Sequence, residues 1–182
     1  LKYKIADKLV LNKFRAALGG KVRACSSGGS ALSKEVGSFF CGIGITIIEG
    51  YGLTETSPVM TVGHSDFFKF GTVGKPIPGV EVKIQPDGEI VCRGHNVMMG
   101  YYKNEEATNE AIIDGWFHSG DIGEFDEDGL LRITDRKKSL IVTSGGKNVA
   151  PQPMEVSLTS NKYIEQCNIV GDDRNFISAL IV

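Results

Sequence analysis

The spacing of apolar positions divides this chain into segments with different predicted structures. Over residues 2–18 apolar side chains recur at helical intervals, which predicts an amphipathic helix that ends at Gly19-Gly20. Residues 22–25 and the β-branched run 43–48 predict two short buried strands. Between these strands lies a polar, glycine-rich turn at residues 26–30.

A second helix is predicted between the two strands. Ser33 can cap its N-terminus, and Glu35 falls in its first turn, where a negative charge is favourable. The resulting order of strand, turn, helix and strand is typical of an α/β layer. The polar segment Glu49–Thr56 then follows the strand at 43–48, at the edge where open parallel sheets bind ligands.

The pattern changes near residue 71, where short alternating strands and tight turns begin. Residues 80–92 predict one hairpin around Asp87-Gly88, and residues 122–133 predict another around Asp128-Gly129. We therefore expect a small β-subdomain in this part of the chain.

The remaining elements are short. Residues 104–113 predict a helix with acidic residues early, and residues 139–143 predict a strand. Pro153 suits the first turn of another helix, and residues 169–170 and 177–182 predict two final strands.

These elements predict an α/β fold in three parts. Residues 1–70 form part of an α/β sheet layer, residues 71–136 form a small β-subdomain, and residues 137–182 form a short α+β segment. The last segment is small for a core of its own.

The composition is that of an ordinary soluble globular protein, with 41% apolar and 23% charged residues. A net charge of −2 argues against a nucleic-acid-binding protein. Residues 1–23 are nevertheless basic, with seven lysines and arginines against one aspartate. We interpret this as a solvated helix face, and peripheral contact with acidic lipid is the alternative.

Several features concern the cellular setting. No apolar run is long enough to span a membrane, and the start shows neither an initiator Met nor a signal peptide. We therefore expect a piece of a longer protein. The four cysteines, at positions 25, 41, 92 and 167, form no CxxC pair, which predicts buried free thiols and a cytoplasmic location.

The segment Glu49–Thr56 combines the groups that a nucleotide site needs. Tyr51 offers a flat face to a base, and Gly52 lets the backbone pass close to a ligand. Thr54 can donate to a phosphate oxygen, and Glu55 can hold Mg²⁺. The alternative is a core tyrosine beside a turn.

Other candidates lie elsewhere along the chain. Gly28-Gly29 suits a close approach of backbone to ligand, or a loop that needs positive φ. Asp121 can accept hydrogen bonds from both ribose hydroxyls, and Arg136 can reach the ribose or a phosphate. A turn aspartate and a surface charge are the alternatives.

Other kinds of site are disfavoured. Residues 124–135 nearly match a calcium loop, but their flanks predict strands, so a hairpin is preferred. The three histidines are too scattered for zinc, and a Walker-type phosphate loop is absent.

Six ordered motifs together resemble the AMP-forming acyl-CoA synthetases, which belong to the adenylate-forming ligase superfamily. The resemblance covers almost the whole chain, and the tail from residue 163 to 174 is most similar to the long-chain fatty acid branch. The motifs that carry it are residues 27–32, 49–56, 71–76, 100–102, 115–123 and 133–151.

The resemblance implies a role for each candidate. Gly50 and Tyr51 would border the adenine, Thr54 would face the phosphates, and Glu55 would help hold Mg²⁺. Asp121 would bind the ribose hydroxyls. The parts at 1–70 and 71–136 would then belong to a large domain, and 137–182 would be a hinge and a truncated lid.

The same resemblance implies the reaction and the remaining roles. A fatty carboxylate would attack the α-phosphorus of ATP, and the thiol of CoA would then displace AMP. Arg136 would support ribose and phosphate, Lys138 would lie at the hinge, and Gly145 would line the path of the pantetheine arm. Catalysis would rest on positioning and charge neutralisation.

Two parts that the resemblance implies are not in this sequence: an upstream phosphate loop and a lysine near the C-terminus. We therefore expect the 182-residue chain alone to form no thioester. Edges left uncovered predict a homodimer or a domain swap. The alternatives are a ligase for another carboxylate, and a non-catalytic nucleotide-binding or interaction module.

Overall fold

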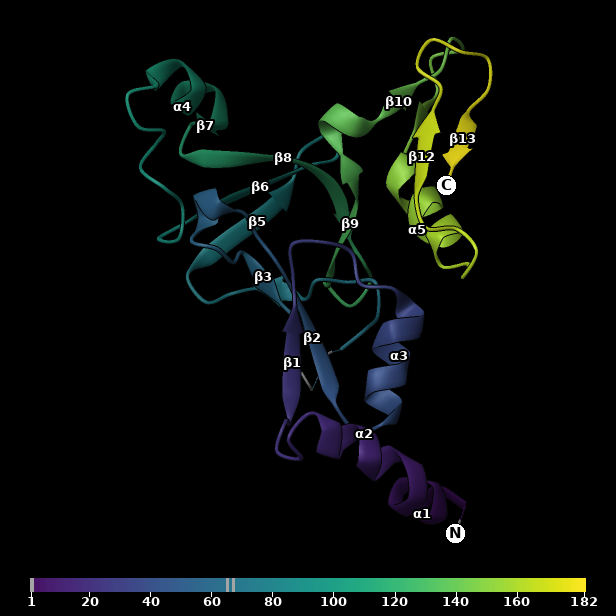
Figure 1. The fold of residues 1–182 in the computed structure, drawn as a ribbon. Helices are drawn as coiled ribbons and strands as arrows, with labels where there is room; N and C mark the ends of the chain where they lie inside the picture. The colour runs from purple at the N-terminus through teal and green to yellow at the C-terminus, as the bar shows by residue number, and fades with distance from the viewer. Residues whose placement is uncertain (1, 65, 67) are drawn as a thin grey trace.

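The computed structural model describes residues 2–64, 66 and 68–182. Figure 1 shows a helix and an α/β unit at the N-terminal end, a β-sheet beyond them, and a C-terminal lobe beside strand β9. This mixed α/β architecture is the predicted fold class.

The N-terminal helix is continuous, as predicted, and contains a π-helical turn. Its parts are α1 (Lys2–Ala6), η1 (Asp7–Leu11) and α2 (Asn12–Ala17). Arg15 ties the helix together and to the rest of the chain, since its guanidinium donates to Asp7 Oδ1 and to the carbonyl of Ile43, both at 2.7 Å. No helix among the described residues is long and apolar enough to cross a membrane.

The first sheet has the order β1–β2–β3–β4. Strands β1 (Ala24–Ser27) and β2 (Thr46–Tyr51) pair in parallel. Helix α3 (Lys34–Gly42) connects them along the chain, and its N-cap is Ser33 as predicted. Strands β3 (Thr61–Val62) and β4 (Lys75–Pro76) extend the sheet in antiparallel fashion. The prediction for the first strand was wrong in two respects: β1 begins two residues later than expected, and none of its residues is buried.

The run 43–48 is divided between a helix end and a strand. Ile43 caps α3, Gly44 has φ +85°, and the Ile45 amide donates to the carbonyl of Phe40. Ile43 and Ile45 are buried at this helix terminus, so these two apolar residues pack around the C-cap of α3 and do not begin a strand. Glu49–Tyr51 therefore lies inside β2, and its predicted position after the strand was wrong.

The second sheet has the order β5–β6–β8–β7, with β9 also paired to β8. Both predicted hairpins are confirmed, and the second includes the disfavoured calcium-loop segment. The hairpins are formed by β5 (Val80–Ile84) with β6 (Glu89–Gly94), and by β8 (Trp116–Phe125) with β9 (Leu131–Arg136).

A short helix, α4 (Glu105–Ala111), precedes this second hairpin and begins at the cap Asn104. The predicted end at residue 113 was too late. Ile112 and Ile113 form β7, because they pair with β8 opposite Phe117 and Trp116.

One hydrophobic cluster joins the two sheets. Tyr51 and Met60 come from the first sheet unit, and Ile90, Phe117 and Leu131 come from the second. Backbone hydrogen bonds reinforce the junction, and Cys92 also lies in this cluster. The other three cysteines are partly exposed free thiols, so the prediction of four buried cysteines was wrong.

The C-terminal lobe follows the short helix η3 (Lys137–Ser139). Its strands are paired as β10 (Ile141–Val142) with β11 (Asn148–Val149), and as β12 (Cys167–Val170) with β13 (Ser178–Ile181). The strand predicted at 139–143 is thus reduced to two residues.

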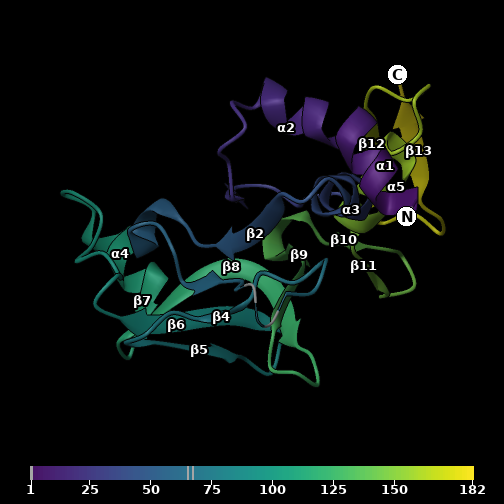
Figure 2. The ribbon, with the colours of Figure 1, turned by 90° about the horizontal axis from the view of Figure 1, so that it is seen from below.

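Helix α5 (Pro151–Thr159) packs against β12 and approaches β9. It begins at Pro151, two residues before the predicted first-turn proline. Figure 2 shows α5 on the same side of the molecule as α3, with the β5–β6–β8 sheet on the other side of β2.

Candidate functional site

A cavity of about 280 Å³ lies where the three parts of the chain meet. The first part contributes the loop after β1 and the end of β2, the second contributes β8 and β9, and the third contributes α5. The lining residues include Ser27, Gly29, Leu32, Glu49, Gly50, Tyr51, Gly52, Asp121, Thr134, Arg136, Gln152, Pro153 and Val156.

The cavity gathers six of the residues that the sequence analysis selected. They are Gly29, Gly50, Tyr51, Gly52, Asp121 and Arg136. The other five, which the structure also describes, do not line it: Gly28, Thr54, Glu55, Lys138 and Gly145. The cavity therefore brings together the residues expected to border the adenine and the ribose, and these roles stay predictions.

Gly28 and Gly52 both lie where the backbone is crowded. A Cβ on Gly28 would lie 3.3 Å from the carbonyl oxygen of Gly50. A Cβ on Gly52 would lie 2.0 Å from the carbonyl oxygen of Pro58. Glycine at position 52 thus lets the Pro58 segment pack on the chain just after β2. Internal packing explains this glycine in the structure, and its approach to a ligand stays a prediction.

Tyr51 and Asp121 form the buried polar centre of the cavity. The Tyr51 hydroxyl donates to Asp121 Oδ2 at 2.6 Å, and the two residues are 8% and 5% exposed. Burial, and then the hydrogen bond to Asp121, raise the pKa of Tyr51 well above its usual range. The hydroxyl therefore stays protonated and donates. One oxygen of the Asp121 carboxylate is occupied by this bond.

Arg136 stands opposite Asp121 across the β8–β9 pairing. Its Nε lies 3.4 Å from Asp121 Oδ1, and its side chain is 71% exposed. The carboxylate thus has one oxygen toward tyrosine and one toward arginine. Because the guanidinium has five donors and most of its surface is open, it can bind an anion while it keeps this contact.

Glu49 is a cavity-lining residue to which the sequence analysis assigned no role. It is 7% exposed, it lines the cavity, and its Oε1 has no hydrogen-bond partner among the described residues. Burial raises the pKa of this carboxyl, while hydrogen bonding with the backbone of Gly71 and Leu32 acts to lower it. The alternation of β2 could have revealed it, since residues 49 and 51 share one strand face.

Replacement of Glu49 by Gln is expected to stabilise the fold at neutral pH by about 1 kcal/mol, because a buried charged oxygen without a partner is costly. A carboxyl whose folded pKa is raised contributes stability that is lost as the pH rises through that pKa. The gain should therefore be present at pH 7 and shrink toward pH 4.5, the ordinary pKa of the group. Urea unfolding across this range measures it, and an equal effect at both ends would contradict the assignment.

Glu55 and Thr54 lie on the short helix η2 (Thr54–Thr56), beside the cavity. The Glu55 carboxylate accepts a hydrogen bond from the Tyr101 hydroxyl at 2.9 Å, and Thr54 is exposed. Among the described residues no cluster of three or more His, Cys, Asp or Glu could hold a metal. Glu55 suits Mg²⁺, which binds proteins through one or two carboxylates and takes its other ligands from phosphate and water.

Lys138 and Gly145 lie in the C-terminal lobe. Lys138 is in η3, directly after β9, and Gly145 is in the exposed turn between β10 and β11. Their positions leave the roles implied by the family resemblance as predictions.

Comparison with known families identifies the class of protein that carries this cavity. A model of the AMP-binding enzymes matches residues 3–102, and a model of the AMP-binding enzyme C-terminal domain matches residues 138–182. The chain belongs to the AMP-binding enzyme family, as its motifs indicated.

Individual relatives point to one branch. The chain is 52% identical over 180 residues to the long-chain-fatty-acid–CoA ligase FadD15 of Mycobacterium bovis, a match that covers 99% of this chain and 30% of the relative. It is 40% identical over 189 residues to the long-chain-fatty-acid–CoA ligase ACSBG2 of Xenopus laevis, covering 100% and 26%. The chain thus spans less than a third of these relatives.

Solved structures share the fold. Unliganded O-succinylbenzoate coenzyme A synthetase of Bacillus subtilis superposes with a TM-score of 0.79 at 28% identity, over 93% of this chain and 41% of that one. The same enzyme in complex with ATP and magnesium ion gives 0.78 at 28% identity, over 93% and 40%.

Proposed function

We propose that this chain is the adenosine-binding part of an ATP-dependent long-chain fatty acid–CoA ligase. The observation that carries the proposal is the cavity in which Tyr51, Asp121 and Arg136 meet. Its buried carboxylate matches a ribose, and its exposed guanidinium matches a phosphate. The relatives named above, with their printed activity on long-chain fatty acids, support the choice of substrate class.

The chain's own residues would act by binding and orienting the nucleotide. Gly50 and Gly52 flank Tyr51 on the cavity wall, so backbone and ring can border a flat base. Asp121 would accept from the ribose hydroxyls while Tyr51 keeps its carboxylate in place. Arg136 would hold the phosphate that links the sugar to the acyl group. None of these steps needs a covalent bond to the protein.

Mg²⁺ and CoA complete the proposal. Bound magnesium would offset phosphate charge, and Glu55, on η2 with its carboxylate bonded to the Tyr101 hydroxyl, is the residue that would hold it. In the complete two-step reaction, the fatty carboxylate would attack the α-phosphorus of ATP, which forms an acyl-adenylate and releases pyrophosphate. The thiol of CoA would then attack the acyl carbon, which forms the thioester and releases AMP. Peripheral membrane contact through the basic N-terminal helix, a cytoplasmic location and a homodimer stay predictions.

Calorimetric titration with a non-hydrolysable acyl-adenylate analogue tests the nucleotide site. Asp121→Asn keeps the side-chain volume and an acceptor for Tyr51 but removes one ribose acceptor and the charge. We expect at least a tenfold loss of affinity, which corresponds to about 1.4 kcal/mol. Asp128→Asn, in the β8–β9 turn and not part of the cavity lining, is the control for the same change of side chain and should bind like the unsubstituted chain.

The outcomes separate the possibilities. Equal affinity of the two variants would contradict the assignment of Asp121 to the ribose. Acyl specificity is tested on the longer protein, where a preference for a short or aromatic acid over a long-chain acid would favour a ligase for another carboxylate. Thioester formation by the 182-residue chain with ATP, CoA and palmitate would overturn the expectation that it needs further segments.

A further inference from the structure

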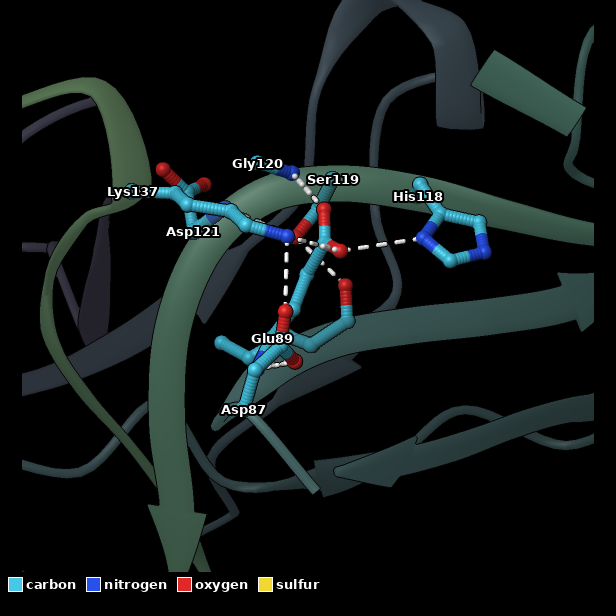
Figure 3. A network of polar contacts seen from close by, with 8 residues as sticks. Asp87, Glu89, His118, Ser119, Gly120, Asp121 and Lys137 are labelled. Carbon is cyan, nitrogen blue, oxygen red and sulfur yellow. Dashed lines mark hydrogen bonds and ion pairs between the residues drawn. The ribbon is translucent and has the colours of Figure 1, made fainter. Parts of the chain in front are cut away.

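Another buried carboxylate lies next to the nucleotide cavity without lining it. Glu89 opens β6 and is 6% exposed. Its Oε1 accepts from the amide of Gly120 at 3.0 Å, and its Oε2 lies 3.0 Å from His118 Nδ1 and 3.1 Å from Lys137 Nζ. Figure 3 shows Glu89 at the centre of these contacts, with His118 and Lys137 on opposite sides. The carboxylate thus joins β6, β8 and η3.

Lys137 has two anchors on the β5–β6 hairpin. Besides Glu89, its ammonium contacts Asp87 Oδ2 at 2.7 Å. The hydrogen bonds to Asp87 and then to Glu89 raise the pKa of Lys137. Burial acts to raise the pKa of Glu89, but the contacts with His118, Lys137 and the Gly120 amide hold it below its ordinary value. Glu89 and Lys137 therefore carry opposite charges at neutral pH.

The backbone places this network next to the charged pair of the cavity. Gly120, which Glu89 holds, precedes Asp121, and Lys137 follows Arg136. Asp121 and Arg136 are opposite one another in the β8–β9 register and lie 3.4 Å apart. The Glu89 contacts thus hold β8 and the start of η3 at the residues that adjoin the pair.

We propose that Glu89 and Lys137 form a clasp that positions Asp121 and Arg136 for the nucleotide and holds the C-terminal lobe over the cavity. Lys137 begins η3, the connection from β9 to this lobe, and Gln152 and Val156 of the lobe line the cavity. Release of Lys137 would loosen the segment that carries both Arg136 and the lobe. The consequence for binding rests on the proposed function, while the restraint of the connection does not.

The chain supplies a matched control for this arrangement. Lys69 also bridges two carboxylates, Asp126 at 2.8 Å and Asp128 at 3.2 Å, and its side chain is 46% exposed, against 47% for Lys137. The Lys69 bridge ends on the β8–β9 turn, and none of its three residues lines the cavity. A general effect of losing one bridging lysine should therefore appear equally in both variants.

The first arm needs no ligand. Hydrogen exchange of residues 136–140 is measured in the unsubstituted chain, in Lys137→Met, in Lys137→Arg and in Lys69→Met. We expect at least tenfold faster exchange in Lys137→Met only, with protection retained by the arginine variant. Asp87→Asn, which removes the exposed anchor alone, should give a smaller increase and provides a second test if Lys137→Met does not fold.

The second arm measures the affinity for AMP in the same variants. We expect a three- to tenfold loss in Lys137→Met and no change in Lys69→Met. In a chain that already carries Arg136→Ala, adding Lys137→Met should reduce the affinity for AMP less than it does in the unsubstituted chain, because the residue that Lys137 positions is gone.

The two arms give distinct failures. Unchanged exchange in Lys137→Met would overturn the clasp. Faster exchange with unchanged AMP affinity would overturn the positioning role. Absence of AMP binding to the unsubstituted chain would count against the proposed nucleotide site, while the exchange arm would still decide whether the clasp restrains the connection.

Discussion

Gly74→Ala is expected to destabilise the fold by about 3–5 kcal/mol, which lies at the upper end for a single substitution. Gly74 has φ +82°, and a Cβ there would lie 2.0 Å from the carbonyl carbon and oxygen of Val62. The obstruction is backbone of β3, which cannot rotate away as a side chain can. The Gly74 carbonyl also accepts from the amide of Leu131, so a shift would disturb the contact between the two sheets.

Gly129→Ala separates the cost of the conformation from the cost of the clash. Gly129 has φ +71°, but a Cβ there would have no atom within 4 Å. Only the left-handed backbone conformation is then penalised, at about 1–2 kcal/mol. Chemical unfolding of both variants gives the comparison. Similar losses for the two would show that β3 and β4 do not meet as closely as the structure describes.

The parts of the fold that were predictable are those in which local pattern and tertiary role agree. The hairpins around Asp87-Gly88 and Asp128-Gly129 combine alternating strands with turn residues, and both form. The Ser33 cap is a local hydrogen bond and also forms. Such signals depend on neighbours in the sequence, so the sequence alone reports them.

The errors arose where tertiary contacts decide. Ile43 and Ile45 resemble the start of a strand, but they are buried at the end of α3. Ile112 and Ile113 continue a helical pattern, but pairing with β8 draws them into a strand. In both cases contacts with residues outside the local segment determined whether the apolar residues form a helix end or a strand.

The cavity shows the same division. Tyr51, Asp121 and Arg136 were selected by residue type and motif, and the structure brings them together. The roles of Glu49 and Glu89 were not apparent, because each depends on burial and on partners from other strands. Sequence reasoning thus found groups suited to ligand chemistry more readily than the groups that hold them.

Tyr51→Phe is expected to reduce stability by about 1.5–3 kcal/mol, the range for a hydrogen bond to a charged group. The substitution removes only the hydroxyl, so the ring keeps its packing against the cluster that contains Met60 and Ile90. Asp121, 5% exposed, then loses its 2.6 Å donor and leaves an unpaired buried oxygen. Tyr163→Phe, at an 81% exposed tyrosine, is the matched control and should change stability by less than about 0.5 kcal/mol.

A double-mutant cycle of Tyr51→Phe with Asp121→Asn shows whether the hydroxyl acts through the carboxylate. If it does, the two losses in unfolding free energy should be less than additive by about 1 kcal/mol or more, because Tyr51→Phe removes the donor of the same hydrogen bond whose charged acceptor Asp121→Asn neutralises. Adenylate affinity should follow the same rule, since an unheld Asp121 presents its oxygens to the ribose less often. Additive losses would mean that Tyr51 contributes through its ring alone. In that case the polar centre of the cavity would consist of Asp121 and Arg136, with Tyr51 serving only as a wall.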